Sequence, residues 1–334
     1  MSDTASSLQP YNTLQLPCHA YQLQTIQSPS QARELLQSGN PPDLILGGGS
    51  NVVLAQPELG QVWLNRIPGR EVLQRDSGHV RIRLGAGENW DAAVAWSLEQ
   101  AAYGLENLSL IPGLCGAAPI QNIGAYGVEL SDFVDCVEAL DLRSGEVHRL
   151  SREDCRFRYR GSIFRDEQAG RWLIIAIELA LRATPQPRLE YPGIREQLAQ
   201  DGQNISAETV RAAVIAIRQA KLPDPAVLGN VGSFFKNPLI NPSQLEQLLN
   251  SHDNCPHWPQ TDGRHKVSAA WLIDRCGFKG YRQGDAGVHQ NHALVLVNHG
   301  QASGNDILQL ARHIQVAVKQ RFAIELEPEP VIIE

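Results

Sequence analysis

The hydrophobic pattern of the chain changes near residues 184–193, a proline-rich, turn-like stretch. Before it, short apolar runs alternate with glycine and other turn residues, a pattern typical of strands. The runs predict strands at 43–46, 51–54, 62–65, 80–84, 137–142 and 172–181. Because helices do not alternate regularly with these strands, the pattern favours an α+β fold over repeated βαβ units.

Helical periodicity dominates after the proline-rich stretch. The last predicted helix is the clearest, because Ile307, Leu310, Ala311, Ile314 and Val318 form one apolar stripe at helical spacing. The other predicted helices lie at 30–38, 89–102, 207–220, 243–249 and 268–276. A final strand is predicted over 323–333.

This change of pattern predicts two domains. We expect a first portion over residues 1–205, made of two α+β subdomains and completed by a C-terminal strand at 322–334. The second domain is expected over 206–321. A chain of 334 residues is long enough for each part to bury a core of its own.

Composition narrows the possible partners. The net charge of −7 gives no basic field for a nucleic acid, and no apolar run approaches the roughly 18 residues that span a bilayer. The first residues lack the basic and apolar regions of a secretory signal, so we expect a cytoplasmic protein. We also expect a monomer. Six cysteines without a CxxC pair predict reduced thiols, and the histidine spacing predicts no metal site.

The segment Gly104–Gly127 has the most informative composition. It contains five glycines and two prolines but is otherwise apolar and almost uncharged. Glycine and proline oppose a regular helix, and an exposed linker is usually more polar. Tight turns with bare backbone amides would instead form an anion-binding concavity suited to a phosphate-bearing cofactor. A structural loop without a ligand is the alternative.

A second glycine loop, Gly47–Asn51, follows a predicted strand. Its amides and serine hydroxyl suit a pyrophosphate, although a hairpin without a ligand has the same composition. A dinucleotide-binding Rossmann unit would require a helix after these glycines. The β-branched run Val52-Val53-Leu54 predicts a strand there, which argues against that fold.

Three further motifs carry polar groups suited to chemistry. Arg158 and Arg160 flank Tyr159 in the sequence FRYRGS, and their guanidinium groups suit a carboxylate. Two arginines on a solvated strand edge would have the same sequence pattern. Ser233 lies between a glycine and two phenylalanines in GSFFKNP, without the G-x-S-x-G of a hydrolase, so a turn serine is the alternative. Glu329 lies in EPEP, which is otherwise typical of a surface tail.

Together these motifs resemble those of the UDP-N-acetylenolpyruvoylglucosamine reductases. The resemblance implies an FAD-binding fold of the vanillyl-alcohol oxidase/PCMH type with a separate α+β substrate-binding domain. It also implies an FAD-dependent oxidoreductase that holds FAD non-covalently and uses NADPH as reductant. The implied reaction reduces the enolpyruvyl ether of UDP-N-acetylglucosamine enolpyruvate to UDP-N-acetylmuramate, in peptidoglycan precursor synthesis.

The resemblance also implies roles for individual residues. Its catalytic residues would be Arg160, Ser233 and Glu329. Its flavin-binding residues would be Gly47, Gly48, Gly49, Ser50, Asn51, Ile111, Pro112, Gly113, Gly116, Ile120, Gln121, Asn122, Gly124 and Tyr126. Its substrate-binding residues would be Tyr159, Tyr191, Lys221, Asn237 and His292.

Three positions depart from the family pattern. Ala117-Ala118 replaces paired serines of some relatives, Gly161 replaces a frequent aspartate, and His292 stands where a relative has glutamine. In the implied mechanism reduced flavin supplies a hydride, Arg160 and Glu329 stabilise the negative charge that develops, and Ser233 delivers a proton. Glu329 would have to be at least partly protonated for that role.

Two other functions remain open from the sequence. A flavin-dependent alcohol or sugar oxidase of the same fold could attach FAD covalently, with His79 or Cys115 as the attachment residue to consider. A non-catalytic protein that binds a nucleotide sugar could keep the loops without the chemistry. Release of flavin on acid precipitation, and NADPH oxidation with the enolpyruvyl substrate, distinguish these from the reductase.

Overall fold

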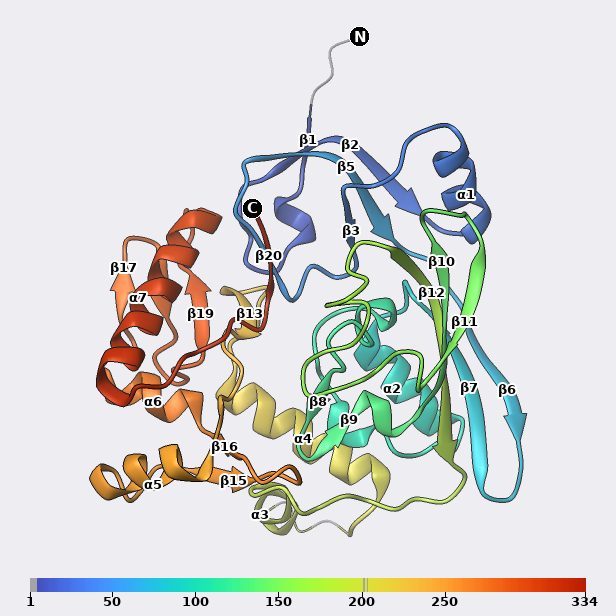
Figure 1. Ribbon diagram of the computed structural model, residues 1–334. Helices are drawn as coiled ribbons and strands as arrows, with labels where there is room; N and C mark the ends of the chain where they lie inside the picture. Colours follow the sequence, from blue (N-terminus) through green and yellow to red (C-terminus); the bar gives the residue numbers. More distant parts are fainter. Residues whose placement is uncertain (1–4, 201, 203) are drawn as a thin grey trace. The chain divides into compact units, whose positions relative to one another are not determined.

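The computed structural model describes residues 5–200, 202 and 204–334. Residues 1–4, 201 and 203, which belong to the predicted first portion, lie outside the described residues. The chain forms two compact units, shown as a ribbon in Figure 1. Most of the first unit comes from Ala20–Gly49 and Leu59–Ala220, and the second comes from Ser7–His19, Ser50–Glu58 and Lys221–Glu334.

A five-stranded antiparallel sheet forms the centre of the first unit, in the order β11-β10-β12-β7-β6. Its strands are β6 (Arg70–Arg75), β7 (His79–Gly85), β10 (Val134–Asp141), β11 (Val147–Ser151) and β12 (Trp172–Arg182). The central strand β12 is buried along most of its length, as its apolar run WLIIAIELALR requires. Figure 1 shows β6 and β7 as a hairpin at one edge of this sheet.

One face of this sheet carries a ladder of alternating charges. Arg83 on β7 contacts Glu138 on β10 at 2.7 Å, and Arg149 on β11 contacts both Glu138 at 3.1 Å and Glu178 on β12 at 2.5 Å. The Glu178 side chain is only 2% exposed, whereas that of Arg149 is 58% exposed. In this ladder the partly solvated Arg149 therefore balances the charge of the buried Glu178 carboxylate.

A second sheet and two helices complete the first half of this unit. The sheet has the order β1-β2-β5-β3, from β1 (Ser6–Ser7), β2 (His19–Ile26), β3 (Leu44–Leu46) and β5 (Glu58–Asn65). Helix α1 (Pro29–Gln37) begins after Ser28, whose side chain accepts from the Gln31 amide. Helix α2 (Trp90–Glu99) begins after Asn89, which caps the Ala92 amide in the same way.

The end of the first unit is helical. Helices α3 (Ile194–Gln200) and α4 (Ala207–Lys221) share a small apolar cluster that includes Leu198 and Val214. Tyr126, from the glycine-rich segment, packs against this cluster. It lies next to the short hairpin of β8 (Gly124–Ala125) and β9 (Val128–Glu129).

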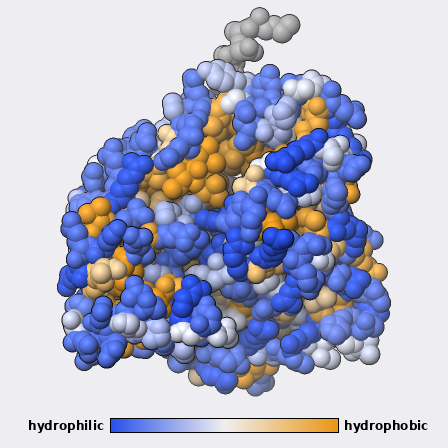
Figure 2. Space-filling view, in the orientation of Figure 1, coloured by the Kyte–Doolittle hydropathy of each residue, from blue (hydrophilic) through white to orange (hydrophobic). Residues whose placement is uncertain are grey.

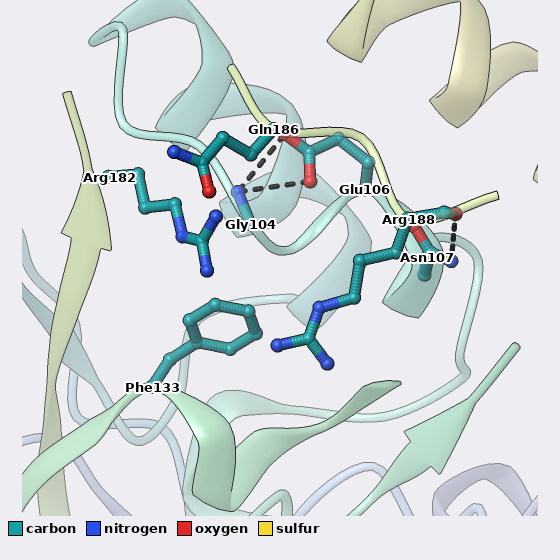
Figure 3. Close-up of a pocket in the computed structure, with 7 residues that line it drawn as sticks. All are labelled: Gly104, Glu106, Asn107, Phe133, Arg182, Gln186 and Arg188. Atoms are coloured by element: carbon teal, nitrogen blue, oxygen red, sulfur yellow. Dashed lines mark hydrogen bonds between the residues drawn. The ribbon is translucent and has the colours of Figure 1, made fainter. Parts of the chain in front are cut away.

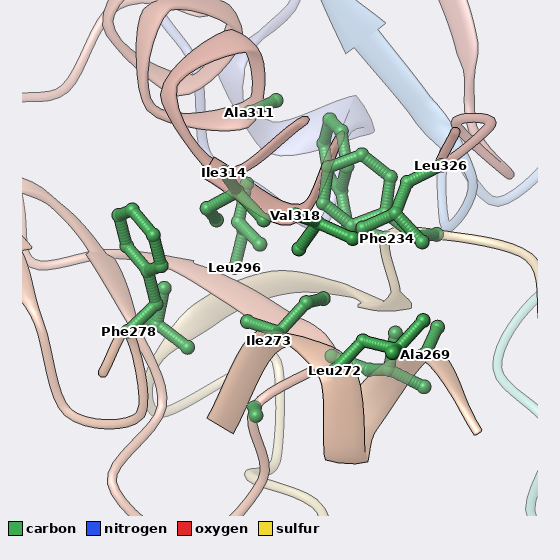
Figure 4. Close-up of a cluster of buried hydrophobic side chains, with 14 of the residues drawn as sticks. Phe234, Ala269, Leu272, Ile273, Phe278, Leu296, Ala311, Ile314, Val318 and Leu326 are labelled. Atoms are coloured by element: carbon green, nitrogen blue, oxygen red, sulfur yellow. The ribbon is translucent and has the colours of Figure 1, made fainter. Parts of the chain in front are cut away.

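The second unit packs helices against a four-stranded sheet. The sheet order is β13-β19-β18-β17, from β13 (Gly229–Ser233), β17 (Arg282–Gln283), β18 (Ala286–Val288) and β19 (Val295–Asn298). Helices α6 (Ala269–Arg275) and α7 (Gly304–Phe322) contribute Leu272, Ile273 and Ile314 to the core in Figure 4, where Phe234 and Leu326 also point inward. The predicted stripe from Ile307 to Val318 is buried, which confirms the last helix.

Smaller elements surround this core. A three-stranded sheet has the order β14-β16-β15, from β14 (Leu239–Ile240), β15 (His257–Pro259) and β16 (His265–Val267). Helix α5 is Pro242–Ser251. The last strand, β20 (Val331–Ile333), pairs in parallel with β4 (Val52–Leu54).

The prediction of a strand over 323–333 was wrong in extent. Helix α7 continues to Phe322, and only Val331–Ile333 form a strand. Pro328 and Pro330 lack the amide hydrogens of a regular ladder, so the preceding segment makes only an isolated bridge between Pro328 and Phe235. The strand after Gly47–Gly49 is confirmed as β4. The domain boundary at residues 205 and 206 stays a prediction.

The surface is largely polar. On the face in Figure 2 hydrophilic residues predominate and hydrophobic residues gather in limited patches, as a chain with 19% charged residues would show. None of the helices that the structure describes is long and apolar enough to cross a membrane.

Candidate functional site

The two glycine loops that the sequence paired are in contact in the first unit. A Cβ atom on Gly48 would lie 2.9 Å from the Gly113 Cα and 3.4 Å from its carbonyl carbon. A Cβ on Gly47 would lie 3.4 Å from the Ala117 Cβ. Glycine at position 48 is therefore required for one backbone to approach the other, and the two loops together form a cradle of main-chain atoms.

The second loop is fixed to the turn between β7 and α2. The Gly116 amide donates to the Ala86 carbonyl at 2.9 Å, and a Cβ on Gly116 would lie 2.5 Å from the Ala86 Cβ. The Cys115 amide donates to the Glu88 carbonyl at 2.8 Å. These bonds hold Gly113 in place on a rigid support, which is the arrangement a bound cofactor needs.

Several residues of the site have left-handed backbone conformations although they are not glycine. Their φ angles are 57° for Leu110, 46° for Asn122, 52° for Tyr126 and 54° for Arg160. Such conformations cost on the order of 1–3 kcal/mol each and persist where surrounding contacts impose them. Four of them in the predicted flavin and arginine segments therefore indicate a site built under constraint.

Asn122 shows how such a conformation is held. Its Oδ1 accepts from the Ser131 amide at 2.9 Å, and its Nδ2 donates to Glu129 at 2.8 Å and to the Arg158 carbonyl at 3.3 Å. The residue is fully buried. Its side chain thus holds the turn together, and its predicted contact with a cofactor stays a prediction.

Arg160 lies in a tight turn that is joined to the flavin segment. The Arg158 and Gly161 backbones exchange hydrogen bonds at 3.1 and 3.0 Å. From this turn the Arg160 Nη2 donates to the Gly124 carbonyl at 2.7 Å. Two bonds further join the segments, from the Ser162 hydroxyl to the Ile120 carbonyl at 2.6 Å and from Arg165 to the Gln121 Oε1 at 3.4 Å.

Glycine at position 161 has a local explanation. A Cβ there would lie 2.9 Å from an oxygen of Asp166, which pairs with Arg158 at 2.6 Å. Gly161 leaves room for this ion pair, and Arg160 is oriented by Gly124 rather than by a neighbouring aspartate. Its guanidinium also lies 5.3 Å from the centre of the Tyr159 ring, which brings two predicted site residues together.

In the second unit Ser233 and Glu329 belong to adjacent segments. Ser233 ends β13 and is followed by two buried phenylalanines. The Glu329 amide donates to the Phe234 carbonyl at 2.8 Å, and the Lys236 amide donates to the Glu327 carbonyl at 2.9 Å. Lys236 and Glu327 also form an ion pair at 2.6 Å. The two predicted catalytic residues of this unit are therefore placed on neighbouring stretches of backbone.

Other predicted residues of the second unit have defined surroundings. The Asn51 Nδ2 donates to the Glu329 carbonyl at 3.2 Å, and the Asn237 Oδ1 accepts from the Ala269 amide at the start of α6. Burial lowers the pKa of His292, as do the charges of His289, Lys221 and Lys279. The positive charges of Lys221 and Lys279 therefore act at His292, as an anionic ligand would require.

The remaining predicted substrate residue, Tyr191, is in the first unit. Its ring packs edge-on against Tyr126, with 5.0 Å between ring centres, and it is 43% exposed. The structure thus brings Arg160, Tyr126 and Tyr191 to the flavin segment in one unit, and Ser233 to Glu329 in the other. That all three catalytic residues meet at one site stays a prediction.

A small pocket beside the glycine segment was not predicted. Figure 3 shows Glu106, Asn107, Phe133, Arg182 and Arg188 around it. Both Glu106 carboxylate oxygens accept from the Gly104 amide at 3.0 Å, and burial raises the pKa of Glu106. Asn107 donates to the Arg188 carbonyl at 3.0 Å, drawn as a dashed line, and to the Tyr126 carbonyl at 2.9 Å. Asn107, which lines this pocket, therefore holds the turn at Tyr126 through its hydrogen bond to the Tyr126 carbonyl.

The two residues considered for covalent flavin attachment differ in exposure. Cys115 is fully buried, and burial raises the pKa of its thiol, so it is a poor nucleophile. His79 is exposed at the start of β7. Among the described residues no group of three or more His, Cys, Asp or Glu side chains is arranged to hold a metal ion.

Comparisons with known proteins match both parts of the chain. Residues 24–151 match the FAD binding domain family, and residues 224–333 match the C-terminal domain of UDP-N-acetylenolpyruvoylglucosamine reductase. The proteins of that name from Chromobacterium violaceum and Pseudomonas aeruginosa are 47% and 46% identical to this chain. The alignments cover 98% and 97% of this chain, and 97% and 96% of the relatives.

A solved structure shares the fold. The UDP-N-acetylenolpyruvylglucosamine reductase of Thermus caldophilus superposes with a TM-score of 0.65 at 24% identity, over 99% of this chain and 98% of that chain. The FAD-binding match and the names of the relatives define an FAD-dependent oxidoreductase, and the superposition agrees with the predicted α+β fold. The chain belongs to the UDP-N-acetylenolpyruvoylglucosamine reductase family.

The glycine cradle fits FAD. The close approach of Gly48 and Gly113 brings the main chains of the two loops together, as in an anion-binding concavity, and the neighbouring segment from Ile120 to Tyr126 mixes apolar and polar groups as a flavin requires. Contacts missed from the sequence include the Arg66 Nη1, which donates to the Gly47 carbonyl at 3.0 Å. Arginines are common on strands, so no sequence signal marked this one.

Proposed function

We propose that the protein reduces the enolpyruvyl ether of UDP-N-acetylglucosamine enolpyruvate to UDP-N-acetylmuramate, with NADPH as the reductant of its flavin. Family membership supports the substrate, because the relatives are named for this reductase activity. The observation that carries the mechanism is the pairing of the Ser233 and Glu329 segments through the Phe234 carbonyl.

FAD held by the first portion of the chain and reduced by NADPH would supply a hydride to the double bond. Negative charge then develops on the substrate carboxylate and its neighbouring carbon. Arg160 stabilises this charge through a guanidinium that suits a carboxylate. Glu329 donates a hydrogen bond in its protonated form, and its backbone is fixed by Phe234 and Asn51.

Ser233 delivers the proton from its hydroxyl to the substrate carbon. It is half-buried at the end of β13, next to Phe234 and Phe235, which exclude water. No hydrogen bond to this hydroxyl is found among the described residues, so its proton is not committed to a protein acceptor. A positioned proton donor contributes about 10²–10⁴-fold to the rate.

In this proposal Lys221 binds the diphosphate of the nucleotide sugar, and His292 contacts the same ligand as a neutral ring. Tyr191 and Asn237 contribute further contacts. The predicted second domain, over 206–321, provides this binding surface, and the first portion holds FAD.

Ser233→Ala tests the chemical step. NADPH should bleach the flavin of this variant at the wild-type rate, whereas the enolpyruvyl nucleotide should restore its colour at least about 100-fold more slowly. Stopped-flow absorbance follows each half-reaction. Ser251→Ala, at an exposed serine of α5, is the matched control and should behave as wild type. Equal loss of both half-reactions in Ser233→Ala would assign the serine a structural role.

A further inference from the structure

Two left-handed residues, Leu110 and Tyr126, flank the predicted flavin-binding segment Ile111–Gly124. Their φ angles of 57° and 52° are unfavourable for residues with a side chain. Leu110 directly precedes Ile111, and Tyr126 ends the same glycine-rich stretch. The conformation of the whole segment therefore depends on contacts that hold these two positions.

One side chain reaches both of them. The Arg218 Nε on α4 donates to the Leu110 carbonyl at 3.2 Å. The charge of the Arg218 guanidinium also acts on the Tyr126 hydroxyl and favours its ionised form. Arginine can do this because its planar fork presents donors in several directions at once.

The surroundings make Arg218 a fixed group. Burial lowers its pKa, and the Tyr126 hydroxyl and Asp91 oppose that shift. Its ordinary pKa is so high that the guanidinium stays charged at neutral pH. Burial raises the pKa of Tyr126, whose hydroxyl therefore stays protonated in the field of the Arg218 charge. A charged donor in a half-buried position is costly to remove, because the Leu110 carbonyl loses its partner.

A neighbouring ion pair supports the same turn from the other side. The Leu110 amide donates to the Asp91 Oδ1 at 2.6 Å, and Asp91 is held by Arg211 of α4 through two bonds of 2.6 and 2.8 Å. Helix α4 thus reaches Leu110 twice, through Arg211 with Asp91 at the amide and through Arg218 at the carbonyl. Arg218 alone extends this support to Tyr126.

We propose that Arg218 is a positioning residue for FAD. Its guanidinium holds Leu110 and Tyr126 in the conformation that shapes the flavin-binding segment, and it does so from a helix outside that segment. This inference rests on FAD binding and on the predicted role of the segment, and it is independent of the substrate and of Ser233. A further consequence is that the Tyr191 ring, which packs on Tyr126, is placed by the same arginine.

FAD release from the holoenzyme tests the proposal. On dilution, Arg218→Met should release FAD with a dissociation constant about 10- to 100-fold above wild type, as expected for loss of a half-buried charged hydrogen bond. Recovery of flavin fluorescence measures this, and visible circular dichroism of the flavin that remains bound should change. Gln219→Met, at the exposed neighbour on α4, is the matched control and should match wild type in both measurements.

Two more variants test the contact itself. Arg218→Lys keeps the charge but loses the fork, and Tyr126→Phe removes the hydroxyl on which that charge acts; each should weaken FAD binding. Tyr126→Phe combined with Arg218→Lys should weaken it by less than the product of the two single effects, because both remove one interaction. Wild-type FAD affinity in both Arg218→Lys and Tyr126→Phe would overturn the proposal, even if Arg218→Met failed to fold. Independent, multiplicative effects would also overturn it.

Discussion

Gly48→Ala tests the contact between the two glycine loops. The new Cβ would lie 2.9 Å from the Gly113 Cα, 3.4 Å from its carbonyl carbon and 3.6 Å from the Leu114 amide nitrogen. All three are backbone atoms, so no side chain can rotate to make room. The φ angle of Gly48 is outside the left-handed region, so the substitution acts through contact and not through backbone strain. The loops must therefore move apart by several tenths of an ångström.

The cost follows from that contact. Overpacking of a tight site typically costs about 1–3 kcal/mol. If the loops keep their spacing in the flavin-free protein, its melting temperature falls by about 2–4 °C for each kcal/mol. If they separate instead, closing them to bind FAD carries the same free energy, which weakens binding by about 5- to 150-fold, since 1.4 kcal/mol is a factor of ten. Calorimetry of the flavin-free protein and flavin fluorescence titration measure the two effects.

Two glycines provide matched controls. Gly78→Ala places its Cβ 3.7 Å from an Asp76 oxygen, an ordinary contact, and should leave both measurements unchanged. Gly47→Ala places its Cβ 3.4 Å from the Ala117 Cβ, so it should not lower the melting temperature of the flavin-free protein. Wild-type melting temperature together with wild-type FAD affinity in Gly48→Ala would show that the two loops do not touch as described.

Three other measurements test separate parts of the structure. Arg149→Met should lower the free energy of unfolding, measured in urea, by about 2–3 kcal/mol, because it leaves the buried Glu178 unpaired. The double variant Arg149→Met, Glu178→Met should recover most of that loss. A free energy of unfolding within about 0.5 kcal/mol of wild type in the single variant would contradict this. Since burial lowers the folded-state pKa of His292, the unfolded state binds more protons below about pH 6.5, and stability should fall as the pH drops from there. In His292→Gln the urea midpoint should depend less on pH over this range. An unchanged dependence of the midpoint on pH would refute the assignment. Acid precipitation should leave the yellow flavin in the supernatant, and colour retained in the pellet would indicate a covalent bond, with His79 the exposed candidate.

The elements with strong local patterns were predictable. Helix α7 was predicted because its apolar residues repeat at helical spacing, and β12 because its apolar run is long and flanked by turns. The exposed edge strands β6 and β11 were not predicted. Their sequences, REVLQR and VHRLS, have little apolar character, so their pairing depends on a neighbouring strand that local pattern does not identify.

The candidate site was only partly predictable for the same reason. Glycine composition marked Gly48 and Gly113, because close backbone approach requires glycine, and the contact between them is present. The residues that hold the site were not marked. Arg218 looks like a solvated helix residue in the sequence, and only its contact with Leu110, 108 positions earlier in the chain, shows another role.

The course of the chain through the two units explains why local sequence could not predict which site residues lie together. The glycine loop Gly47–Asn51 begins in the first unit, and Ser50 is already part of the second. Within Ser50–Glu58, β4 pairs with β20, a strand at the far end of the sequence that also belongs to the second unit. The Asn51 side chain donates to the Glu329 carbonyl, two residues before that strand. A predicted flavin-binding residue and a predicted catalytic residue are thus joined by a hydrogen bond although 278 positions separate them in the sequence. No local window of sequence contains both. Because β4 has only three residues, its pairing with β20 must be stabilised by the core around it. A substitution of Ile332, which packs against that core, should therefore alter the position of Glu329 more than the positions of residues far from β20.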